Sequence, residues 1–136
     1  MIDREPFLAR VEEYHKGGWR LALINAASVL SNEQYPEGAC EIAWVFAKGT
    51  ELEKIREVVV PGDEVPSISA SYGAAFLYEN EIRELFGMNV TGINLDLQGQ
   101  LYKTAERIPF SPSAIRARLE KAGTLPAAAA SGAKQA

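Results

Sequence analysis

Three carboxylates lie close together in the segment ENEIRELFGM, which covers residues 79–88. Glu79, Glu81 and Glu84 could carry out general acid–base chemistry, which needs two carboxylates that face one cleft and have different pKa values. A run of acids on a helix more often forms a solvated or ion-paired surface. A third interpretation is that these glutamates border a surface that binds another protein, where charges make the fit selective.

The spacing of apolar residues predicts a helix over residues 72–86. At about 100° per residue, one stripe of this helix should cover a sheet. That stripe contains Ala75, Tyr78, Ile82, Leu85 and Phe86. Glu79 falls at its edge, four residues before Arg83, which is the favourable order for an acid–base pair. Glu81 and Glu84 project on the far flank, so the pattern is weak support for two carboxylates that share a cleft.

The first half of the predicted helix is apolar or aromatic nearly all the way round. Phe76 points roughly opposite to Leu85, and Leu77 follows it. A helix that is apolar on every side is usually buried, and one small sheet cannot bury both sides. An aromatic patch bordered by charge often marks a protein interface. We therefore expect Phe76 and Leu77 to contact a partner, with Glu81 and Glu84 pairing with its basic residues.

The composition limits the chemistry of this chain. It has 136 residues, enough for one domain, and a net charge of −4, which argues against nucleic-acid partners. It contains one cysteine, Cys40, and one histidine, His15. These cannot form a disulfide framework, a zinc site or an iron–sulfur site, so we expect no metal-binding or cofactor-binding residue. The placement of the glutamates favours a surface over a cleft, so we expect no catalytic residue either. The charged start argues against a signal peptide, and the lack of a run of about 20 apolar residues argues against direct membrane insertion.

The chain order predicts an α+β fold with a mostly antiparallel sheet. A short helix is expected over residues 6–15, and strands are expected over residues 19–30, 40–47 and 54–61. Short links between consecutive strands favour a meander. One face of that sheet should be packed against the main helix over residues 72–86.

Three parts of the chain are expected to differ in their roles. Residues 1–104 should form the α+β domain. Residues 105–123 read as an extended docking arm and a short helix, in which Pro109 and Phe110 wrap a partner and Ser111 caps the helix. Residues 124–136 are alanine-rich and are expected to be a disordered tail.

The order of these features resembles the 30 kDa subunit family of respiratory-chain NADH dehydrogenase (NADH:quinone oxidoreductase, or complex I). Its members share a segment of the type E-R-E-x-x-D/E-hydrophobic-F-G, and VPS precedes it here at residues 65–67. The likeness covers about residues 5–95. The matching residues of the segment are Glu79, Glu81, Glu84, Leu85, Phe86 and Gly87.

Two departures separate this chain from complex I members. Asn80 replaces the middle arginine, and Ile93 stands near the place of the usual His or Lys after Phe-Gly. The chain is also shorter and differs after Gly92. These features resemble the hydrogenase branch of the family, which consists of small subunits of membrane-bound, energy-converting [NiFe] hydrogenases such as the Ech-type and CO-induced enzymes.

The resemblance implies an accessory subunit with no redox centre of its own. It would pack against the large subunit that carries the [NiFe] centre, next to an iron–sulfur small subunit, and orient the large subunit for electron transfer coupled to ion translocation. Such a complex places the chain peripherally on the cytoplasmic side of the cell membrane. The expected partner-binding residues are Phe76, Leu77, Glu79, Glu81, Glu84, Phe86, Gly87, Pro109 and Phe110.

Two alternatives remain open. The same kind of subunit occurs in NADH:quinone oxidoreductase and in formate hydrogenlyase complexes. In a different class, the chain would be a stand-alone small-ligand enzyme that uses Glu79 and Glu81.

Overall fold

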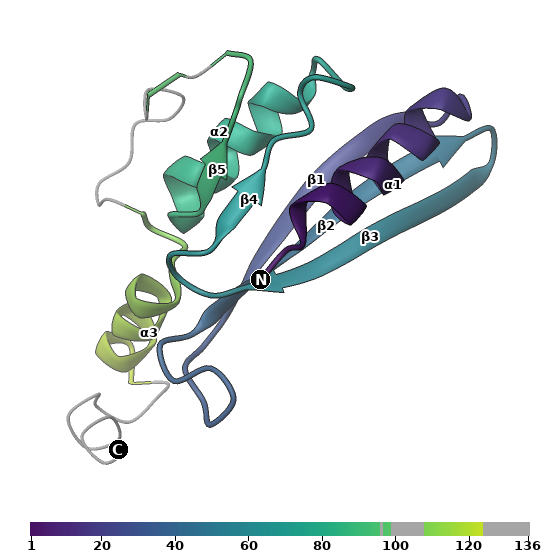
Figure 1. The fold of residues 1–136 in the computed structure, drawn as a ribbon. Coiled ribbons are helices and arrows are strands. Elements are labelled where there is room, and N and C mark those ends of the chain that lie inside the picture. The colour runs from purple at the N-terminus through teal and green to yellow at the C-terminus, as the bar shows by residue number, and fades with distance from the viewer. Residues whose placement is uncertain (96, 99–107, 124–136) are drawn as a thin grey trace.

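The computed structural model describes residues 1–95, 97–98 and 108–123, and it confirms the predicted α+β class. A three-stranded antiparallel sheet, a two-stranded parallel sheet and helices make up the described chain (Figure 1). The predicted tail, and the boundary expected near residue 104, lie outside the described residues. The elements are α1 (Arg4–Lys16), β1 (Arg20–Val29), β2 (Ala39–Lys48), β3 (Glu51–Val59), β4 (Glu64–Pro66), α2 (Ala75–Phe86), β5 (Asn89–Thr91) and α3 (Pro112–Lys121).

The large sheet is the predicted meander, with strand order β1-β2-β3 and antiparallel pairing throughout. β2 and β3 are joined by a two-residue turn, because Lys48 pairs with Glu51. Gly49 has a φ of 60° in this turn, which is a conformation that tight hairpin turns require. A register shift between Leu21 and Leu23 marks a β-bulge in β1.

One face of this sheet forms the main core. Ile42, Trp44 and Phe46 alternate along β2, and each is almost completely buried. α1 lies across this face (Figure 1), where the Phe7 ring packs 4.7 Å from Trp44. The Tyr14 ring stacks 4.4 Å from Phe46. The sequence pattern predicted the buried strand face, but it assigned the covering role to the main helix alone.

α2 packs beside β1 at the same core. Two tyrosine hydroxyls reach the outer edge of the sheet there: Tyr78 donates to the Ala22 carbonyl at 3.2 Å, and Tyr72 donates to the Trp19 carbonyl at 2.8 Å. β1 is an edge strand of the sheet, so among the described residues no further strand pairs with its outer side. The two tyrosine hydroxyls bind carbonyl groups at this edge.

The strands before and after α2, β4 and β5, form a two-stranded parallel sheet. Val65 pairs with Val90, and both side chains are buried in the core. The sequence did not predict this pair, because each strand is only three residues long and offers no periodic pattern to detect.

The C-terminal segment packs on the rest of the chain. Pro112 contacts the loop between β1 and β2 so closely that a Cβ atom on Gly38 would lie 2.5 Å from the Pro112 Cβ. The Ser28 hydroxyl donates to the Phe110 carbonyl. Ser111 caps α3 as predicted, since its side chain accepts from the Ala114 N–H at 3.2 Å.

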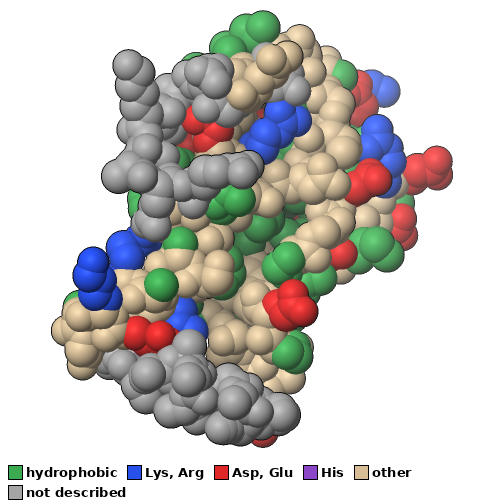
Figure 2. Space-filling view, turned by 90° about the vertical axis from the view of Figure 1, so that its left-hand side faces the viewer, with side chains coloured by type: hydrophobic (Ala, Val, Ile, Leu, Met, Phe, Trp, Pro, Cys, Tyr) green, Lys and Arg blue, Asp and Glu red, His purple; other side chains and the backbone are tan. Residues whose placement is uncertain are grey.

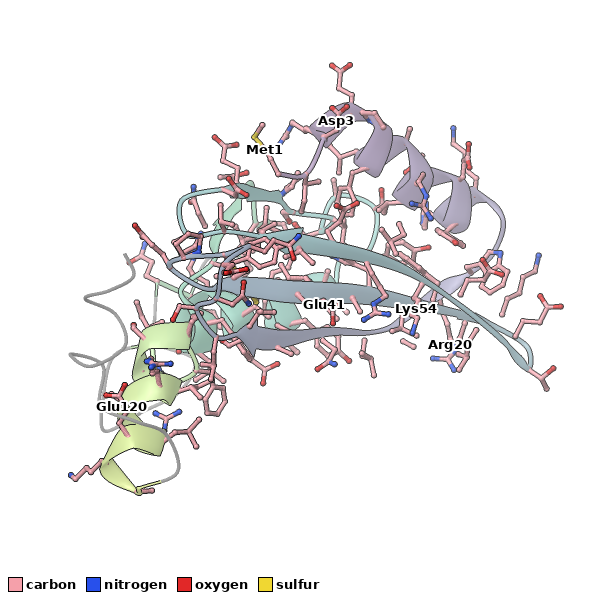
Figure 3. The ribbon with its side chains drawn as sticks, turned by 90° about the horizontal axis from the view of Figure 1, so that it is seen from below. Met1, Asp3, Arg20, Glu41, Lys54 and Glu120 are labelled. Atoms are coloured by element: carbon pink, nitrogen blue, oxygen red, sulfur yellow. The ribbon has the colours of Figure 1, made fainter. Side chains whose placement is uncertain are left out.

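The other face of the large sheet carries no helix among the described elements. The side chains on this face are here called the open face. α1 lies on the opposite side of the strands from Arg20, Glu41 and Lys54, which are labelled in Figure 3. β3 forms one edge of the sheet, and within the described chain it pairs with β2 alone.

Candidate partner-binding site

α2 positions most of the residues that the sequence singled out. It begins at Ala75, three residues later than predicted, because residues 68–72 form turns in which the Ser71 and Tyr72 N–H groups donate to the Ile68 carbonyl. It ends at Phe86, and Gly87 follows as the C-cap with a φ of 74°, a left-handed conformation that favours glycine. A Cβ atom at Gly87 would lie 2.8 Å from the Ile108 side chain, so this glycine lets residue 108 pack on the helix end.

Glu79 lies in the interior with 1% of its surface exposed, so its predicted position at the edge of a partner-binding surface is wrong. Its Oε1 accepts from the Ser67 hydroxyl at 2.6 Å, and its Oε2 accepts from the Ile68 N–H at 2.7 Å. Burial raises the pKa of the Glu79 carboxyl, and the bonds from Ser67 and Ile68 oppose that shift. Both carboxylate oxygens therefore accept hydrogen bonds from the segment that follows β4.

The Glu79 bonds continue into a chain of hydroxyls. Because the Ser67 hydroxyl donates to Glu79, the 2.8 Å contact between Ser67 and Ser69 is a bond donated by Ser69. The Ser69 oxygen in turn accepts from the Asn94 N–H at 2.9 Å. This network joins α2, the segment after β4 and the segment after β5, which brings together two of the stretches that carry the family resemblance.

Asn80 is also fully buried, with 0% exposed. Its Nδ2 donates to the Leu95 carbonyl at 2.9 Å and to the Phe76 carbonyl at 2.7 Å, and its Oδ1 accepts from the Leu97 N–H at 3.0 Å. A neutral amide satisfies these donors and acceptors without burying a charge. Asn80 is the residue at which this sequence departs from the family segment. Its side chain holds the backbone after β5 through hydrogen bonds, a role that the sequence did not predict.

Glu81 and Glu84 are half-buried, and each interacts with another group of the chain. Around the helix axis, Glu81 is about 200° from Glu79. The two carboxylates therefore point to opposite sides of α2, and they cannot share the single cleft that an enzyme using this pair would need. The catalytic alternative loses its geometric basis.

Leu77, Glu81 and Glu84 form a line along α2 because they are spaced four and three residues apart. We call these three residues the outer stripe. The stripe lies about 200° around the helix from the buried Ala75. Leu77 is 48% exposed, and the neighbouring Phe76 is half-buried. The predicted apolar contact at Leu77 is thus on the surface of the described chain.

A second apolar contact lies at the end of α2. The Phe86 ring packs 5.4 Å from Phe110, which is 41% exposed, and the Phe110 N–H donates to the Leu85 carbonyl at 2.6 Å. Pro109 is buried, so it is not an exposed contact in the described chain. Hydrophobic side chains gather near the centre of the face that carries α2 and α3 (Figure 2).

The described residues contain no group of three or more His, Cys, Asp and Glu side chains placed to hold a metal ion. Within the same part of the chain, no helix is both long and apolar enough to cross a membrane. Comparison of the sequence with protein-family models finds no match, and no curated protein matches it significantly.

Proposed function

We propose that this chain is an accessory subunit of a membrane-bound, energy-converting [NiFe] hydrogenase. In this role it carries no redox centre and packs against the catalytic large subunit, next to an iron–sulfur small subunit. It holds the large subunit in the orientation needed for electron transfer coupled to ion translocation. The partner subunits supply the [NiFe] centre and the clusters, and they hold the chain at the cytoplasmic side of the membrane.

The outer stripe of α2 is the observation that carries this proposal. One side of α2 is committed to the core and to the loops held by Glu79 and Asn80. The other side presents Leu77, with nearly half of its surface exposed, in line with two glutamates. An exposed apolar side chain flanked by carboxylates suits a partner that offers an apolar pocket bordered by basic residues.

The contacts between the two resembling stretches also support the proposal. Ser67 belongs to the Val-Pro-Ser approach, and Glu79 opens the glutamate segment; they form a 2.6 Å hydrogen bond although they are 12 residues apart. Residues that match a family segment at separate places thus meet in one structural unit. These contacts hold α2 in one orientation relative to the segment after β4, and they therefore set the direction in which the outer stripe faces.

The experiment is co-purification of a tagged chain from its source organism. The wild-type chain should retain a cysteine-rich large subunit that contains nickel, identified by mass spectrometry and metal analysis. Leu77→Glu should lose that subunit, because a charge would enter an apolar contact. Ala9→Glu is the matched control, since Ala9 is an exposed apolar residue on α1, outside the outer stripe and outside the large sheet.

Recovery of the wild-type chain as a free monomer would refute the assembly role. Co-purification with an NADH-oxidising module would assign the chain to NADH:quinone oxidoreductase, and co-purification with a formate dehydrogenase would assign it to a formate hydrogenlyase complex. Equal retention of the large subunit by Leu77→Glu and wild type would show that the outer stripe is not the contact.

A further inference from the structure

The open face of the large sheet is a second surface that the α2 interface does not use. Strand alternation and register place its members on the side away from Ile42, Trp44 and Phe46. No described helix covers it, and Leu52 at its margin is 70% exposed. Ala39 and Ala47, near the two ends of β2, are buried members of this face. The other members are Arg20, Leu23, Asn25, Ala27, Val29, Glu41, Ala43, Val45, Leu52, Lys54, Arg56 and Val58.

Short side chains make the centre of the open face shallow. Ala43 is flanked by Asn25 on β1 and by Arg56 on β3, and Ala27 lies diagonally beside it, opposite Glu41. Alanine projects little from a sheet, so another backbone can approach the middle of β2 closely. Longer side chains lie on the flanking strands, with Leu23 on β1 and Lys54 and Arg56 on β3.

The charge of the open face is opposite to that of the whole chain. Three cations, Arg20, Lys54 and Arg56, share the face with one carboxylate, Glu41, which forms a 2.6 Å ion pair with Arg56. The face therefore has a formal charge of +2, whereas the chain carries −4. Arg20 and Lys54 lie on the same side of the sheet as Glu41 (Figure 3).

We propose that the open face docks an acidic surface of another polypeptide. The shallow centre admits the backbone of a helix or loop, and Arg20 and Lys54 pair with carboxylates on either side of it. A second copy that docks through its own open face would bring like charges together. Single-stranded nucleic acid is bound by aromatic platforms, and this face has none. Anionic membranes attract clusters of about four to eight cations, and here there are three, one of them already paired.

This inference concerns the open face alone and holds for any assembly that contains the chain. A photo-crosslinking residue in place of Val45, introduced in the source organism, should form a covalent link to an acidic segment of another protein. Arg20→Glu combined with Lys54→Glu should lower that yield by about tenfold, since reversed charges repel an acidic partner. The matched control is Lys16→Glu with Lys48→Glu, which changes the net charge equally and alters exposed lysines outside this face.

Each outcome decides the question. A link from position 45 that is lost only in the Arg20/Lys54 variant supports the inference. Links to lipid, to nucleic acid, to a second copy or to residues 124–136 would overturn it. A parallel crosslinker at position 77 separates the two proposals: a link from 77 with none from 45 retains the α2 interface and rejects the open face. A link from position 45 with none from position 77 retains the open face and rejects the α2 interface.

Discussion

The buried carboxylate of Glu79 should be a main contributor to the stability of the α2 region. Glu79→Ala removes the acceptor for both the Ile68 N–H and the Ser67 hydroxyl. A buried donor left without a partner costs about 1–3 kcal/mol, and the missing side chain also leaves a cavity. We expect the free energy of unfolding to fall by about 3–5 kcal/mol, from a total that is about 5–15 kcal/mol in most domains.

The charge of Glu79 should also leave a signature in the pH dependence of stability. Because burial raises its pKa above the ordinary value of 4.5, the folded chain holds more protons than the unfolded chain between 4.5 and the raised value. The contribution of this group therefore decreases as pH rises through that window. Glu79→Gln does not titrate, so the stability difference between wild type and this variant should shrink with rising pH.

Urea unfolding followed by tryptophan fluorescence measures both effects, since Trp44 is buried in the core. Glu51→Ala and Glu51→Gln are the controls, because Glu51 is an exposed carboxylate at the start of β3 and surface substitutions change stability by about 0.5 kcal/mol or less. A loss below about 1 kcal/mol for Glu79→Ala would refute the role assigned to the two hydrogen bonds. A stability difference that grows with rising pH for Glu79→Gln would refute the sign of the pKa shift.

Three further predictions follow from the same structure. Asn80→Leu should speed hydrogen exchange of the Leu97 amide by about tenfold or more while leaving β2 amides unchanged, because that amide loses its acceptor. Gly87→Ala should cost about 1–3 kcal/mol in thermal or urea unfolding, and more than Gly49→Ala, since both glycines have positive φ but only Gly87 is crowded by a side chain. Burial raises the pKa of the Cys40 thiol to about 11, so mass spectrometry at pH 8 should detect iodoacetamide alkylation only after unfolding; rapid labelling of the native chain would contradict this.

Residue alternation was enough to predict the sheet. Ile42, Trp44 and Phe46 on one side of β2, with short polar links before and after, indicated a meander that the structure has. The sequence pattern predicts a start of α2 at Tyr72, because aromatic and alanine residues continue the helical pattern upstream of Ala75. Turns over residues 68–74 replace the first helical turn, and their backbone bonds to Ile68 could not be read from spacing.

The inward position of Glu79 and Asn80 could not be predicted from a helical wheel that assumed one buried side. The segments after β4 and after β5 both pack on α2, and irregular segments need side-chain partners for their buried backbone groups. A polar pair within an apolar helix, together with the serines at 67 and 69, is the signal that could have indicated this role. Even with that signal, the pairing of Ser67 with Glu79 depends on the tertiary path of the chain.

The outer edge of β3, which no other strand of the described residues pairs with, has a consequence for the behaviour of the chain at high concentration. If two copies extended the sheet symmetrically, the faces would match only when the twofold axis passed through a residue. An axis at Glu53 or Lys54 sets that side chain against its own copy, and an axis at Ile55 sets Glu53 against Glu57 and Lys54 against Arg56. Each of these three registers brings equal charges face to face. These like-charge contacts therefore disfavour dimers in which two copies of the chain join symmetrically at the β3 edge.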